Sequence, residues 1–161
     1  MTHFSVLFVC MGNICRSPTA HGVFRHKVRE QGLSEAVEVD SAATHNFHPN
    51  SPPDERSQAH AAKRGYDLSD LRARQIKAAD FEEFDLILVM DHDNLTLVQQ
   101  EYGDRAFATY PPLCSYCGFG IPAILEVARM DQTWLHFPIA APAQCESFQQ
   151  QTFDALVHRF L

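Results

Sequence analysis

One stretch near the N-terminus constrains this chain more than any other. It is a run of apolar residues that leads into a loop bounded by Cys10 and Arg16. The apolar run predicts a buried β-strand over residues 4–9. The Ser17-Pro18 pair after the loop predicts a helix, with Ser17 as its N-cap and Pro18 at its first position. The chain is therefore expected to pass from a buried strand, through a short loop, into the N-terminus of a helix.

The loop between Cys10 and Arg16 has the composition of an anion-binding site. Its backbone N–H groups and the positive end of the helix dipole are expected to point into one small bowl. Gly12 is expected to adopt backbone angles that are closed to other residues. Asn13 and Ser17 can hydrogen-bond the backbone and the sulfur. Since the planar guanidinium of Arg16 can hold two oxygens of a tetrahedral anion, the bowl suits phosphate.

Cys10 is the candidate nucleophile of this loop. A thiol at a helix N-terminus beside a guanidinium loses its proton readily, so we expect a thiolate at neutral pH. A thiolate can attack phosphorus to form a phosphocysteine, while the loop amides and Arg16 stabilise the charge of the transition state. The alternative is an inert buried cysteine at a strand end. The complete order of strand, loop, arginine, serine and proline favours the catalytic interpretation.

Composition limits the size and the partners of the protein. At 161 residues, with 45% of them hydrophobic, the chain is predicted to form a single domain over residues 1–161. The net charge of −7 argues against a nucleic-acid or anionic-membrane surface. No basic segment precedes the first apolar run, and no stretch approaches the ~20 apolar residues of a membrane span. We therefore expect a cytoplasmic monomer.

The cysteines indicate reduced thiols. Their number, five, is odd, and they lack the dense spacing of a secreted disulfide scaffold. Cys114 and Cys117 form a lone Cys-x-x-Cys pair without a second pair or histidines at ligand spacing, so we predict no zinc site. No other pattern in the sequence requires a cofactor.

Strand and helix patterns alternate along the chain. After the first strand and a helix over 17–31, strands are predicted over 37–41, 86–90 and 106–110, and helices over 54–65, 93–102 and 146–160. Such alternation predicts an α/β fold, a single doubly wound domain with a central, mainly four-stranded parallel sheet flanked by helices. Ligands of such sheets bind beyond the carboxyl ends of the strands, which is where the Cys10 loop is expected.

The sequence Cys-Met-Gly-Asn-Ile-Cys-Arg-Ser-Pro, which starts at Cys10, resembles the phosphate-binding loop of the low-molecular-weight protein tyrosine phosphatases. The resemblance extends, in the family's order, over about residues 4 to 115, through segments 39–44, 52–56, 64–69 and 84–91 followed by Asn94-Leu95. It implies a phosphatase acting on phosphotyrosine in a protein or on a small aryl phosphate. The implied phosphate-binding loop consists of Met11, Gly12, Asn13, Ile14, Cys15 and Ser17, with Cys10 and Arg16 as catalytic residues.

The resemblance also implies roles around the loop. Ser41 and Asn46 follow the second strand, where the family has contacts to the loop. Phe47 lies near an aromatic position that in the family forms a wall of the pocket for a phenyl ring; an ordinary packed aromatic is the alternative. Cys15 is implied to form a disulfide with an oxidised Cys10, which would spare Cys10 irreversible oxidation. A core thiol is the other interpretation of Cys15.

A leaving aryl oxygen also needs a proton from a carboxylic acid. In the family this acid belongs to an Asp-Pro pair, about thirty residues from the C-terminus, that tyrosines usually follow. No such pair occurs there in this sequence. Asp131 is the only aspartate between residues 105 and 153, and Trp134 lies where a pocket aromatic would fit. We therefore predict Asp131 as the acid, with Glu126 as the next candidate.

Two other functions use the same loop. A thiol-dependent arsenate reductase would bind arsenate in the bowl and transfer a disulfide from Cys10 to a further pair, for which Cys114 and Cys117 are candidates. Their spacing is shorter than that class normally uses. A non-catalytic phosphate- or phosphotyrosine-binding module is suggested by the missing Asp-Pro pair. The presence of Cys10 disfavours this module, because binding alone needs no nucleophile.

Overall fold

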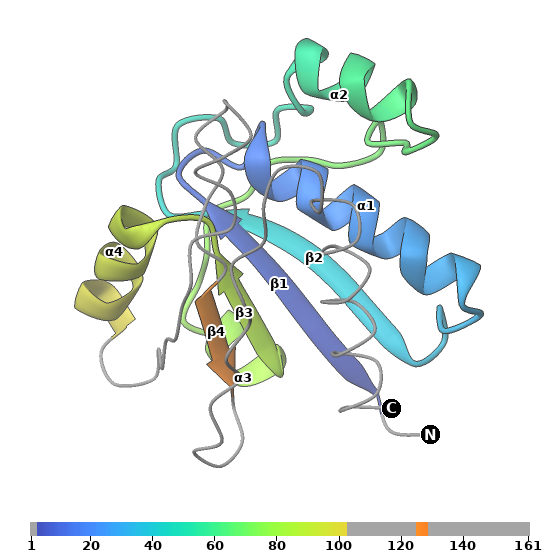
Figure 1. Cartoon of the computed structure of the whole chain (residues 1–161). Helices are drawn as coiled ribbons and strands as arrows, with labels where there is room; N and C mark the ends of the chain where they lie inside the picture. The colour runs from blue at the N-terminus through green and yellow to red at the C-terminus, as the bar shows by residue number, and fades with distance from the viewer. Residues whose placement is uncertain (1–2, 103–124, 129–161) are drawn as a thin grey trace, which may run out of the picture.

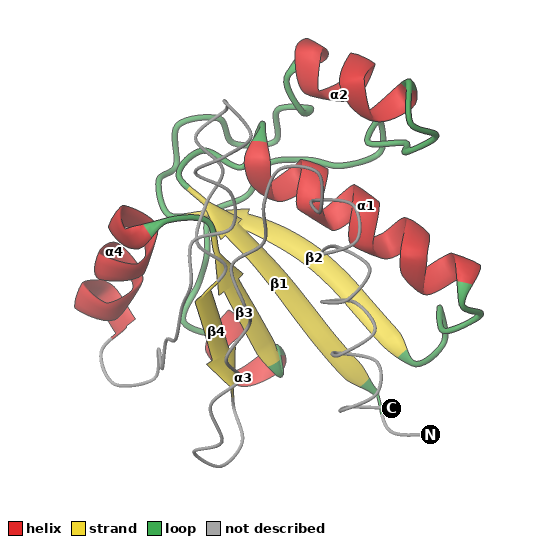
Figure 2. Ribbon diagram, in the orientation of Figure 1, coloured by secondary structure: helices red, strands yellow, loops and turns green. Residues whose placement is uncertain are grey.

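The computed structural model describes residues 3–102 and 125–128. Figures 1 and 2 show these residues as a sheet flanked by helices. In chain order the elements are β1 (Phe4–Cys10), α1 (Arg16–Glu30), β2 (Val37–Ala43), α2 (Glu55–Ala62), α3 (Asp80–Glu83), β3 (Leu86–Val89), α4 (His92–Tyr102) and β4 (Leu125–Ala128). The strand expected over 106–110 and the helix expected over 146–160 lie outside the described residues.

The sheet has the strand order β2-β1-β3-β4. β1 pairs in parallel with both β2 and β3, which confirms the predicted α/β fold with a parallel sheet. All seven residues of β1 are buried, as expected for a central strand covered on both faces. β4 pairs antiparallel with β3 and was not predicted, because its four residues carry too short a pattern to indicate a strand.

Helices cover the two faces of the sheet. On one face, Phe24 and Val28 of α1 pack against Phe8 and its neighbours in β1 and β3. On the other face, Phe81 of α3 and Val98 of α4 join a second cluster of sheet residues. Figure 1 shows α1 in front of the sheet and α3 behind it. None of the helices in the described part of the chain has the length and apolar character needed to cross a membrane.

The start of α1 differs from the prediction. The helix begins at Arg16 and its N-cap is Cys15, so the assignment of Ser17 as N-cap was wrong. The Ser17 side chain is instead fully buried in the first turn, where it contacts Cys10 and Asn13. Pro18 still fits because the first N–H groups of a helix need no intrahelical acceptor.

Other helix boundaries follow local signals. Gly32 ends α1 in the left-handed conformation, with φ of +71°, and Leu33 N donates to Val28 O at 3.0 Å, as in a Schellman cap. α2 is shorter than the predicted 54–65, and its N-cap Asp54 accepts from Arg56 N. α4 begins at His92, one residue before the predicted start.

Candidate active site

Cys10 ends β1 at the carboxyl edge of the sheet, opposite Ala43 of β2. It is only 3% exposed. Asn13 N donates to Cys10 Sγ at 3.2 Å, and Ser17 Oγ lies 3.0 Å from the same sulfur. The loop predicted from the sequence therefore wraps around the sulfur, with two polar groups of the loop and of the first helical turn in contact with it.

Asn13, not Gly12, carries the unusual backbone conformation of the loop. Asn13 has φ of +53° and is buried, whereas Gly12 is not among the residues of positive φ, so that expectation was wrong. Asparagine tolerates this region because its side chain can hydrogen-bond locally. Gly12 instead allows close packing, since a Cβ built on it would lie 3.3 Å from His48 Cδ2.

The loop presents free backbone donors. Some N–H groups of the loop and of the first helical turn donate to no acceptor among the described residues. They belong to Met11, Gly12, Ile14, Cys15, Arg16 and Ser17. Several of these groups belong to the first turn of α1 or lie just before it, where N–H groups lack intrahelical partners and the helix dipole is positive. Such a set of donors can bind a tetrahedral oxyanion.

Arg16 is held by a carboxylate from another strand end. Its Nη1 donates to Asp91 Oδ2, and both side chains are about one third exposed. Asp91 lies two residues after the end of β3, and its Oδ1 accepts from Asn94 N, in the first turn of α4, at 2.8 Å. This contact engages one end of the guanidinium and leaves the other donors of Arg16 without a described acceptor.

The segment after β2 runs beside the loop. Thr44 N donates to Cys10 O at 2.8 Å, and His45 N donates to Met11 O at 3.0 Å. Phe47, 60% exposed, stacks on the His45 ring with centroids 4.8 Å apart. Asn46 is also exposed. Phe47 is thus an exposed ring attached to a segment that contacts the loop.

Ser41 is a residue of β2, two positions before the strand ends at Ala43. Its Oγ is 3.2 Å from Nδ1 of His21, a buried residue of α1. His21 Nδ1 also lies 3.9 Å from Asp40 Oδ1. Burial lowers the pKa of His21 to about 4, while the charge of Asp40 opposes this effect. His21 is therefore a neutral imidazole at physiological pH.

We expect His21 to make stability depend on pH. Between its ordinary pKa near 6.5 and its folded value of about 4, the unfolded chain binds a proton that the folded chain does not. The free energy of unfolding should therefore fall by roughly 3 kcal/mol as the pH falls through this window. Urea unfolding of wild type and His21→Gln at several pH values measures the difference. His26→Gln, on the same helix with a partly exposed ring, is the control; equal pH dependence in all three proteins would contradict the prediction.

Other predicted residues fall elsewhere. Asp131, Trp134, Cys114 and Cys117 lie outside the described residues. Glu126 belongs to β4, in register with Leu88. Cys15 is a half-buried free thiol in the loop.

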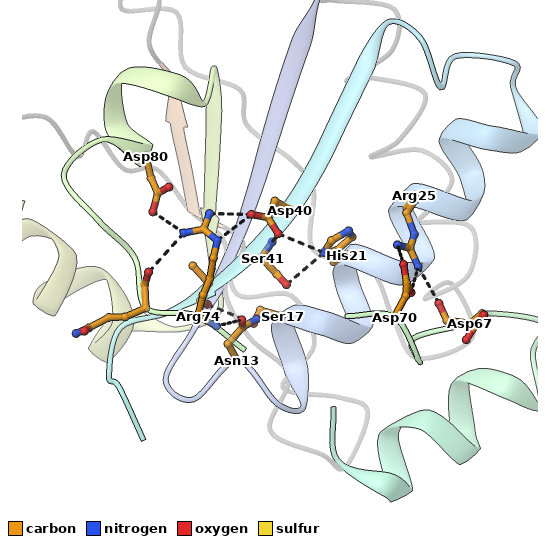
Figure 3. Close-up of polar contacts among 12 residues, drawn as sticks. Asn13, Ser17, His21, Arg25, Asp40, Ser41, Asp67, Asp70, Arg74 and Asp80 are labelled. Atoms are coloured by element: carbon orange, nitrogen blue, oxygen red, sulfur yellow. Dashed lines mark hydrogen bonds and ion pairs between the residues drawn. The ribbon is translucent and has the colours of Figure 1, made fainter. Parts of the chain in front are cut away.

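Sequence reasoning missed two residues near the loop, Asp91 and Arg74. Asp91 had a signal, because it follows a buried apolar strand at the edge where ligands bind. Arg74 had none, since it lies in a segment without a helix or strand pattern. Its backbone N–H donates to Asn13 Oδ1 at 3.0 Å. Figure 3 shows Arg74 between Asn13 and two carboxylates.

Comparison with known proteins gives consistent matches. Residues 5–119 match the family described as low molecular weight phosphotyrosine protein phosphatase. The human protein of that name is 53% identical over 91 residues, which cover 56% of this chain and 57% of the human protein. The crystal structure of YfkJ from Bacillus subtilis has a TM-score of 0.62 and 37% identity, and the match covers 64% of this chain and 65% of YfkJ.

A crystal structure of a protein tyrosine phosphatase from Entamoeba histolytica has a TM-score of 0.65 and 26% identity, with 97% of this chain and 96% of that chain covered. The match to the human relative spans little more than half of that protein's length. The family match, however, includes most of this chain: all of β1 except Phe4, the whole loop after Cys10, and α1. The chain belongs to the low molecular weight phosphotyrosine protein phosphatase family.

Proposed function

We propose that this protein is a protein tyrosine phosphatase that acts through a phosphocysteine on Cys10. The observation that supports this most directly is the arrangement around the sulfur. Asn13 N donates to Cys10 Sγ at 3.2 Å, and the loop around it holds Arg16 and backbone N–H groups that have no acceptor among the described residues. Hydrogen bonds donated to sulfur favour the thiolate, and the remaining donors can hold a phosphoryl group beside it.

The reaction has two steps. The Cys10 thiolate attacks phosphorus, the bond from phosphorus to the aryl oxygen breaks, and the leaving oxygen takes a proton from a carboxylic acid. Water then attacks the phosphocysteine and gives a proton to the same carboxylate. Cleavage of the P–S bond releases phosphate and restores the thiolate. In both steps the loop N–H groups and Arg16 stabilise charge on the equatorial oxygens.

The direct test is hydrolysis of phosphotyrosine and of a nitrophenyl phosphate across a range of pH, with trapping of the phosphoenzyme at short times. We expect phosphate release and a phosphoryl group on the peptide that contains Cys10. Binding of phosphate without turnover would favour the binding module. Arsenate-dependent oxidation of a thiol donor, with a Cys114–Cys117 disulfide, would favour the reductase.

Asp131 is proposed as the general acid. A strongly basic leaving oxygen depends on protonation more than the weakly basic oxygen of a nitrophenyl ester does. Asp131→Asn should therefore slow phosphotyrosine hydrolysis much more than nitrophenyl phosphate hydrolysis, and the descending limb of the pH–rate profile should flatten. Steady-state rates for the two substrates measure the effect. Equal slowing of both would exclude this role, and the acid would then be either Glu126 or absent.

A further inference from the structure

The side chain of Asn13 connects the sulfur site to a polar cluster below the loop. Its Nδ2 donates to Ser17 Oγ at 2.8 Å, and its Oδ1 accepts from Arg74 N at 3.0 Å. Asn13 is 2% exposed and Ser17 is fully buried, so water cannot readily replace these contacts. Figure 3 shows the two side chains next to Arg74.

The Arg74 amide sets the direction of this hydrogen-bond chain. A backbone N–H can only donate, so it requires the carboxamide oxygen of Asn13 on its side and turns the carboxamide NH2 toward Ser17. Ser17 Oγ then accepts from Asn13 and has its own proton to give. Its possible acceptors are Cys10 Sγ at 3.0 Å and Ala42 O at 3.4 Å. The sulfur is the nearer one, and a thiolate can only accept, so the hydroxyl is placed to donate to Cys10 Sγ once Cys10 is ionised.

The side chain of Arg74 anchors that amide. Its Nε and Nη2 contact Asp40 Oδ2 at 2.9 and 2.8 Å, and its Nη1 contacts Asp80 Oδ2 at 2.9 Å. Asp80 is almost completely buried and also accepts from Lys77 N at 2.7 Å. The guanidinium therefore bridges β2 and the start of α3, two elements far apart in the sequence, with its planar fork.

The backbone on either side of Arg74 is tied to the end of β2. Ala43 N donates to Arg74 O at 2.8 Å, and Ile76 N donates to Ala43 O at 2.9 Å. Ala43 is also the residue opposite Cys10 in the sheet. The Arg74 amide is thus held in position relative to the strand pair that carries the nucleophile.

We propose that Arg74, clamped by Asp40 and Asp80, is a positioning residue that orients Asn13 and Ser17 as donors to the Cys10 sulfur. This role rests on the proposed function, since it matters through the thiolate state of Cys10. Loss of the clamp lets the Asn13 carboxamide turn, and the Ser17 proton then has no fixed direction. The sulfur loses a donor and becomes a thiolate only at higher pH.

The test is the pH dependence of Cys10 alkylation by iodoacetamide in the full chain, followed by mass spectrometry of the Cys10 peptide. In Arg74→Gln we expect the midpoint of the profile to rise by about one pH unit, so that alkylation well below the midpoint slows about tenfold. The charged and titratable side chains of Arg16, Cys15, Asp91 and His45 around the sulfur are kept in this variant. The substitution removes one positive charge beside Asp40, Asp80 and His21.

Arg25→Gln is the matched control. Arg25 also makes a bidentate contact with a carboxylate, with Nη1 and Nη2 at 2.7 and 2.8 Å from the Asp70 oxygens, but its contacts lie away from the loop. Figure 3 shows both arginines. Equal midpoints in Arg74→Gln and Arg25→Gln overturn the proposal. The readout needs no phosphatase activity, so a failure of the proposed function would appear separately, as an absent phosphocysteine.

A second pair of variants covers the case in which Arg74→Gln does not fold. Asp80→Asn removes the negative charge that pairs with Arg74 and keeps the size of the side chain. Asp70→Asn makes the same change at the control pair with Arg25. Asp80→Asn should raise the midpoint of Cys10 alkylation relative to Asp70→Asn. Identical profiles of these two variants would overturn the role of the clamp.

Discussion

Cys10→Ser is expected to reduce turnover to the background level while binding of phosphate or vanadate remains measurable. A serine hydroxyl at this position is not ionised at neutral pH and cannot form the phosphocysteine. Serine is close in shape to cysteine and can accept from Asn13 N as the sulfur does. The substitution leaves the loop N–H groups and Arg16 unchanged, so the anion site should persist. Phosphate release and calorimetric titration with vanadate measure the two properties.

The control for this variant is Cys145→Ser, the same change at a cysteine to which no role in the site is assigned. It should keep wild-type activity. If Cys10→Ser retained even a tenth of the wild-type rate, Cys10 would not be the nucleophile. If it lost both turnover and vanadate binding, the anion site would depend on the sulfur itself and not on the loop donors.

The part of the site that could be predicted from the sequence is the part encoded by neighbouring residues. The central strand, the loop and the helix that carry Cys10 and Arg16 follow one another directly, and their apolar run, proline and serine are local signals. The partition of roles within the loop was less predictable. The sequence predicts the unusual backbone angles at Gly12, whereas the structure has the positive φ at Asn13.

The reason lies in contacts between distant residues. Asn13 Oδ1 accepts a hydrogen bond from the backbone N–H of Arg74, 61 residues away in sequence. Arg16 donates to Asp91, which is 75 residues away. No local pattern specifies such pairs, because only the register of β1 with β2 and β3 brings the strand ends together. The N-cap assignment of Ser17 failed for a different reason: its partners Cys10 and Asn13 are close in sequence but contact it only when the loop folds around the sulfur.

The contact between Arg16 and Asp91 underlies the second large effect that we expect. Arg16→Lys should lower the rate of phosphate release by ~10² to 10³, the usual cost of removing a preorganised transition-state contact. A guanidinium can keep one nitrogen on Asp91 and present others to two phosphoryl oxygens, whereas an ammonium is a single point of charge. A lysine ammonium could therefore pair with the Asp91 carboxylate or with the phosphoryl group. It could not hydrogen-bond both in the way that a guanidinium does.

The measurement is kcat and kcat/KM for a nitrophenyl phosphate, with Arg25→Lys as the matched control. Arg25 also pairs with a carboxylate, Asp70, but takes no part in the loop. A near-normal kcat in Arg16→Lys would show that a positive charge at this position is sufficient and that the fork is not needed. Asp91→Asn adds a second comparison, because it keeps the guanidinium but weakens its anchor. If the fork and its orientation both matter, kcat in Asp91→Asn should fall between those of wild type and Arg16→Lys.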